Sequence, residues 1–104
     1  MSTLSREELQ GLFRSTVDLS PQQRLIVMLY ASIEPEASGA VRRTSADLAE
    51  LSGYNSQSFS RARKDVIRAG YLVEVPEERV GVVRYYALSP KALGREDDTL
   101  PAAA

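Results

Sequence analysis

The sequence of 104 residues contains neither cysteine nor histidine. Without these residues the chain cannot build zinc sites, iron–sulfur clusters, cysteine nucleophiles or serine–histidine triads. The absence of cysteine also excludes disulfide bonds, as is typical of proteins in a reducing cytoplasm. We expect no cofactor, no metal and no enzymatic activity, because no acid, base and nucleophile can be assembled from the residues that are present.

Long apolar runs are missing as well. The longest, Leu25 to Ala31, is too short to cross a bilayer, and the charged residues at positions 6–8 argue against a signal peptide. We therefore expect a cytoplasmic protein with no membrane partner. The length and the 43% of hydrophobic residues suit one core. We predict a single domain over residues 1–93 and a disordered tail over 94–104.

The net charge of −1 hides an uneven distribution. Residues 42–91 carry nine basic and six acidic side chains, whereas the segments on both sides are net acidic. The basic residues are densest between Ser56 and Arg68. The overall balance argues against indiscriminate coating of nucleic acid, and the basic segment favours a local contact with an anionic partner.

Two helices are predicted in the first third of the chain. Ser5 begins a capping box, and Leu9, Leu12 and Phe13 recur at helical spacing, which indicates an accessory helix over about residues 5–16. Its apolar residues fit either core packing or a dimer contact. A second helix begins at Ser20-Pro21 and is apolar nearly all round, so it must be buried on more than one side.

Two more helices are predicted in the basic segment, over about residues 44–53 and 56–69. The first directs Leu48, Ala49 and Leu51 inward. Ala49 and Gly53 supply the small side chain and the flexible corner that a steep crossing over a tight turn requires. A glycine at position 70 stops the second helix.

A β-hairpin follows these helices. Residues 71–75 and 80–88 are rich in β-branched and aromatic side chains, and Pro76 to Arg79 is the predicted turn between them. This prediction places the acidic Glu77 and Glu78 at the tip of the hairpin.

The helix over residues 56–69 has two contrasting faces. Its apolar stripe, which includes Phe59 and Val66, is expected to face the core. At about 100° per residue, the opposite stripe is basic and hydrogen-bonding. That stripe contains Gln57, Arg61, Lys64 and Arg68.

A basic helix face is commonly just a solvated surface. Its position directly after a tight helical turn favours DNA contact instead, with short hydroxyls and long polar side chains near the helix start reading base edges. The base-reading candidates are Ser56, Gln57, Ser58, Ser60 and Arg61. The phosphate-contact candidates are Arg42, Arg43, Thr44, Arg63, Lys64, Arg68, Arg79 and Arg84.

The segment Thr44 to Leu72, TSADLAELSGYNSQSFSRARKDVIRAGYL, resembles the helix-turn-helix of bacterial winged-helix regulators of the MarR, PadR and ArsR type. Arg84 to Ala92, RYYALSPKA, is similar to the strand that closes their wing. The resemblance implies an α+β, mostly helical, winged helix-turn-helix fold of about four helices and a C-terminal hairpin. It also implies a homodimer that binds double-stranded DNA in a sequence-specific manner, with residues 56–69 in the major groove.

Two features depart from the pattern. The acidic pair at the predicted hairpin tip would repel phosphates, and the long C-terminal dimerisation helices are missing. The prediction is a transcriptional regulator, such as a repressor, or a site-binding factor for plasmid, phage or chromosome maintenance. The alternative is a winged-helix module that docks an acidic protein partner.

Overall fold

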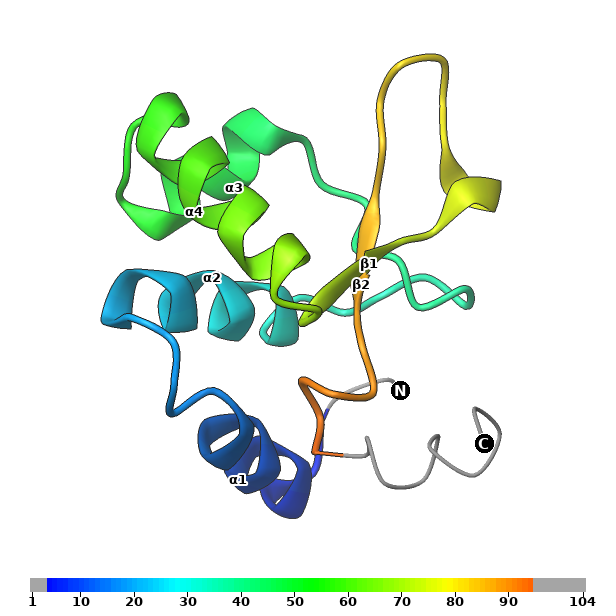
Figure 1. Cartoon of the computed structure of the whole chain (residues 1–104). Helices are drawn as coiled ribbons and strands as arrows, with labels where there is room; N and C mark the ends of the chain where they lie inside the picture. Colours follow the sequence, from blue (N-terminus) through cyan, green and yellow to red (C-terminus); the bar gives the residue numbers. More distant parts are fainter. Residues whose placement is uncertain (1–3, 95–104) are drawn as a thin grey trace.

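Residues 4–94, the part of the chain that the computed structural model describes, fold into four α-helices and a two-stranded antiparallel sheet. This α+β arrangement is consistent with a winged-helix layout (Figure 1). The elements are α1 (Arg6–Ser15), α2 (Pro21–Ala31), α3 (Ser45–Ser52), α4 (Ser56–Arg68), β1 (Leu72–Glu74), the short 3₁₀ helix η1 (Pro76–Glu78) and β2 (Tyr86–Leu88). Except for Gly94, the tail predicted over residues 94–104 lies outside the described residues.

Each α-helix begins at a side-chain cap. Ser5 and Ser20 form capping boxes, in which the third residue of the helix bonds back to the cap. Thr44 caps α3 and Asn55 caps α4, each by accepting a hydrogen bond from a backbone amide three residues later. These caps fix where the helices start, and those at Ser5 and Ser20 are the ones that the sequence predicts.

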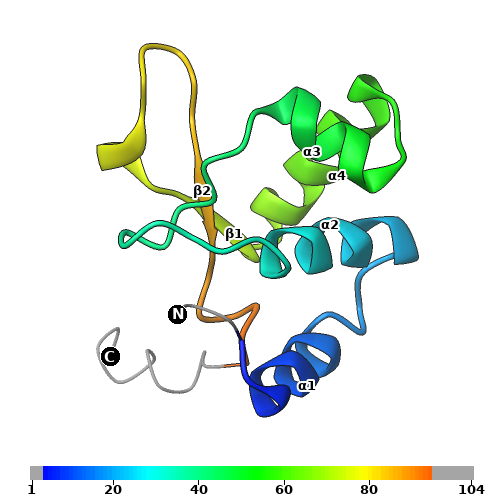
Figure 2. The ribbon, with the colours of Figure 1, turned by 180° about the vertical axis from the view of Figure 1, so that it is seen from behind.

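The core forms around α2, which lies between α1 on one side and the α3–α4 pair on the other (Figures 1 and 2). Ile26 and Val27 of α2 are fully buried, in agreement with its apolar character. They share one cluster with Leu48 from α3 and with Phe59 and Val66 from α4. The predicted inward position of Leu51 is wrong, because this side chain is 57% exposed at the far end of α3.

The sheet is much shorter than predicted. Leu72 pairs with Leu88 and Glu74 with Tyr86, so β2 starts six residues later than the predicted strand. On its other edge Tyr86 pairs with Val41, whose amide donates to the Tyr86 carbonyl at 2.8 Å. Strand β2 is therefore held between β1 and the segment that leads into α3.

The chain reverses at a different place from the predicted turn. Residues 75–85, here called the hairpin loop, begin with η1, and the tight reversal comes later, at Gly81-Val82. Val80 and Val83 exchange two backbone hydrogen bonds across it, at 3.0 and 2.9 Å. Gly81 has φ of 60°, as two-residue hairpin turns with glycine at the first central position require. The valines on both sides of this glycine give the segment the composition of a strand, which explains why the sequence predicts one there.

The corner between α3 and α4 gives a direct test of backbone strain. Gly53 has φ of 81°, and a Cβ added there would meet no atom within 4 Å. We expect Gly53→Ala to lower the free energy of unfolding by about 1 kcal/mol through backbone strain alone. Gly53→Asn should cost less, because asparagine tolerates left-handed backbone. Urea denaturation measures both, and an alanine variant as stable as the wild type would contradict the explanation.

Candidate nucleic-acid interface

Helix α4 presents the predicted polar stripe to solvent. Phe59, Ala62 and Val66 are buried against the rest of the core and fix the rotation of the helix. The exposed side chains on the opposite stripe are Gln57, Arg61, Lys64 and Arg68. The structure therefore brings these four candidate residues together on one accessible face.

The serines at the start of α4 do not all share that face. Ser56 is exposed, whereas Ser58 and Ser60 are half-buried. Ser58 lines a shallow hollow between α4 and the start of α2, together with Gln22 and Gln23. Of the five base-reading candidates, Ser56, Gln57 and Arg61 are therefore the most accessible.

Asp65 is the acidic residue of α4, and it sits beside the stripe. Its carboxylate lies 3.4 Å from Arg68 and also accepts a hydrogen bond of 3.4 Å from the Gln23 amide of α2. The Arg68 side chain is 79% exposed in this pair. An exposed pair of this kind contributes little stability, so Arg68 can exchange Asp65 for a phosphate.

Arg63 is half-buried and held by contacts to neighbouring elements, although the sequence suggests a freely exposed phosphate contact. Its guanidinium donates to the Tyr30 hydroxyl at 3.3 Å and to the Ser45 hydroxyl at 3.0 Å. It also lies 5.2 Å from the centre of the Phe59 ring and 5.3 Å from that of Tyr86. The cation thus connects α2, α3, α4 and β2 with a fixed orientation.

Burial raises the pKa of the Tyr30 phenol above its ordinary value of 10.0, and the neighbouring Arg63 only partly offsets this effect. The phenol is therefore neutral at physiological pH, when its oxygen accepts the hydrogen bond from Arg63. Sequence reasoning missed this contact, because Tyr30 and Arg63 are 33 residues apart.

Arg63 also lines a polar hollow of about 500 Å³ between the start of α3 and the hairpin loop. Arg43 and Thr44 line it from the α3 side, and Arg84 from the loop. The hollow thus unites four of the eight phosphate-contact candidates. Among residues 4–94, none of those that line it is acidic. Three arginines and no acidic residue line this space, which favours the binding of a phosphate group.

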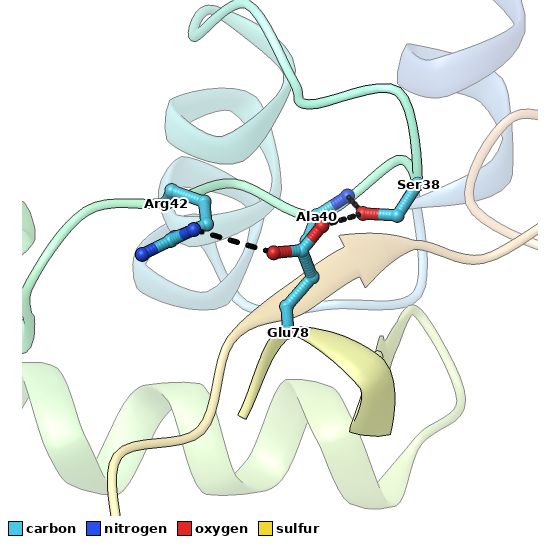
Figure 3. Close-up of polar contacts among 4 residues, drawn as sticks. All are labelled: Ser38, Ala40, Arg42 and Glu78. Carbon is cyan, nitrogen blue, oxygen red and sulfur yellow. Dashed lines mark hydrogen bonds and ion pairs between the residues drawn. The ribbon is translucent and has the colours of Figure 1, made fainter. Parts of the chain in front are cut away.

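Arg42 points toward the base of the hairpin loop rather than into this hollow. It lies 3.4 Å from the Glu78 carboxylate, which also accepts a hydrogen bond of 2.7 Å from the Ser38 hydroxyl (Figure 3). The Arg42 guanidinium lies 5.0 Å from the centre of the Tyr85 ring. These contacts partly neutralise Arg42 and attach the loop to the segment before α3.

The expected position of Glu77 and Glu78 at the hairpin tip is wrong. Both belong to η1 near the start of the loop, whereas the reversal is at Gly81-Val82. The tip itself is apolar, and Val82 is 89% exposed. The exposed Arg79 and Arg84 lie on either side of the tip in sequence. The acidic pair therefore does not block the approach of an anion to the tip.

No family model, curated protein or solved structure matches the chain. Within residues 4–94, the helices are too short and too polar to cross a membrane.

The burial of the Tyr30 phenol predicts a specific pH dependence. Below pH 10.0 the phenol is protonated in both states, but above it the unfolded phenol ionises while the raised pKa keeps the folded one neutral. The free energy of unfolding should therefore fall as the pH rises past 10. Denaturant titrations from pH 8 to about 11 should show a shallower fall for Tyr30→Phe. If the free energy of unfolding fell equally with pH in Tyr30→Phe and in the wild type, the raised pKa of Tyr30 would be contradicted.

Proposed function

We propose that the protein is a winged helix-turn-helix protein that binds double-stranded DNA in a sequence-specific manner, with α4 in the major groove. The observation that carries this proposal is the arrangement of cations around α4. Its outer face bears an exposed basic stripe, and the arginine-lined hollow adjoins the same helix through Arg63. The hairpin loop then acts as the wing.

The accessible residues divide naturally between two tasks. Gln57 and Arg61, near the start of α4, have the length and the donors to read base edges, with Ser56 beside them. Lys64 and Arg68, further along the stripe, contact phosphates. This division places sequence discrimination in the first two turns of α4.

The hollow gives the wing side of the complex a separate anchor. Arg43 and Arg84 approach one phosphate from the start of α3 and from the loop, and Arg63 closes the hollow from α4. Because contacts on its inner side already orient Arg63, little side-chain entropy is lost on binding. A bound phosphate fixes the wing relative to α4.

Phosphate neutralisation supplies most of the affinity. With about four contacts per protomer, a dimer on a palindrome would show a slope near −7 for log affinity against log salt. Two copies of α4 then contact half-sites about 34 Å apart. A homodimer of this kind, as in the MarR, PadR and ArsR groups that the sequence resembles, suits a transcriptional repressor or a plasmid, phage or chromosome site-binding factor.

One observation favours a second candidate function, the docking of an acidic protein. Val80, Val82 and Val83 are exposed at the loop tip, close to Arg79 and Arg84. Apolar side chains beside cations suit a protein surface with acidic and apolar groups. The same hollow would then hold a carboxylate.

DNA binding is tested by selecting bound duplexes from a random pool and measuring affinity by fluorescence anisotropy at several salt concentrations. We expect a palindromic site and a loss of about tenfold for Arg61→Ala on that site, with weaker discrimination at one base position. Arg14→Ala, which removes an exposed cation from α1, is the control and should bind as the wild type does. Absence of duplex binding at low salt would reject the proposal in favour of an acidic protein partner.

The arginine-lined hollow has its own test. Arg84→Ala should weaken binding about equally on all sequences and reduce the salt slope by about one per protomer, because each protomer then neutralises one phosphate fewer. Arg42→Ala serves as the matched comparison, because its guanidinium is already paired with Glu78. An effect of Arg84→Ala confined to one base position would show that the residue reads sequence rather than holding a phosphate.

A further inference from the structure

Helix α1 exposes a row of large apolar side chains. Leu9, Phe13 and Val17 are 39%, 52% and 65% exposed, and they follow one another at intervals of four residues. Residues four apart lie on the same side of a helix, so Leu9 and Phe13 form a continuous strip. Val17 follows in the turn just after the helix end. By contrast, Leu12 is fully buried in the core.

Hydrogen bonds from two other parts of the chain hold α1 in this orientation. The Tyr71 hydroxyl donates to the Ser15 carbonyl at 2.8 Å. Arg24 of α2 donates to the Phe13 carbonyl at 3.0 Å and to the Thr16 hydroxyl at 3.2 Å. The outward position of the apolar row is therefore fixed by the fold and does not come from a loosely attached helix.

Charges mark the two ends of the row. Arg6 is seven residues before Phe13 and lies on the same side of α1, whereas Asp18 follows Val17 at the opposite end. Within residues 4–94, neither charged group has an ion-pair partner. A second α1 in antiparallel orientation would place each Arg6 near the other copy's Asp18. A parallel orientation would place like charges together.

We propose that this row, Leu9, Phe13 and Val17, is the surface on which a second copy of the chain docks, with the two α1 helices antiparallel. The symmetric contact covers the apolar strip on both copies and forms the Arg6–Asp18 pair twice. Charge complementarity is what selects another copy of this chain as the occupant.

The position of α1 is compatible with the proposed function, on which this inference builds. Helix α1 lies on the side of the molecule away from α3 and the hairpin loop (Figures 1 and 2). A copy seated on it therefore leaves the hairpin loop and the arginine-lined hollow accessible. A two-fold dimer is also the form that a palindromic site requires.

The small size of the surface sets the strength of the dimer. A helix of 10 residues is about 15 Å long, which is too short to bury the ~800 Å² per partner of a standard interface. We expect a reversible dimer with a dissociation constant in the micromolar range.

Sedimentation equilibrium of the full chain without DNA, from low micromolar to near-millimolar concentration, tests the proposal. The average mass of the wild type should rise from one protomer toward two. Phe13→Glu should weaken association at least tenfold. Leu51→Glu is the matched control, since Leu51 is exposed to a similar degree on α3, and it should associate like the wild type. Circular dichroism verifies that each variant is folded.

A charge exchange tests the orientation. Arg6→Glu and Asp18→Arg should each weaken the dimer a few-fold, because each brings like charges together, and the double variant should recover the wild-type association. Failure of the double variant to recover would overturn the antiparallel arrangement. A wild type that stays monomeric throughout, or a Phe13→Glu variant that associates normally, would overturn the docking surface. None of these measurements involves DNA, so loss of the proposed DNA binding would be seen separately.

Discussion

The relative positions of the central elements depend on the guanidinium of Arg63. It bonds to Tyr30 of α2 and Ser45 of α3, and it lies against the rings of Phe59 and Tyr86. The guanidinium is half-buried, and hydrogen bonds to its donors offset the cost of removing them from water, which favours this arrangement of the partners. These contacts connect α2, α3, α4 and β2, and the same residue lines the arginine-lined hollow. Its structural and proposed binding roles are therefore inseparable.

Features that depend on neighbours in the chain could be predicted from the sequence. The caps at Ser5 and Ser20, the corner at Gly53 and the two faces of α4 all follow from local backbone chemistry and helical periodicity. Features that depend on distant contacts could not. The position of the Arg63 side chain depends on Tyr30 and Tyr86. Both lie far from it in the chain, so no local sequence pattern indicates the contacts.

The hairpin is a second feature that depends on distant contacts and could not be predicted from the sequence. Valines around Gly81 have the composition of a strand, but a strand also needs a partner, and no segment within residues 4–94 pairs with them as a strand. The pairing therefore shrinks to three residues on each side, and the intervening chain becomes the hairpin loop. Glu78 contacts Arg42 and Ser38 instead, away from the tip where the sequence analysis predicts it. A proposed obstacle to anion binding becomes an attachment point for the loop.

The bridge between Val41 and Tyr86 has a consequence for solubility. A short sheet normally leaves unpaired backbone groups along its outer strands, and such groups can recruit strands from other molecules. Here the segment leading into α3 occupies one edge of β2 through a single residue. That edge cannot serve as a template for intermolecular β-sheet growth while the bridge holds. The connection into α3 thus occupies the pairing position at Tyr86 on that edge.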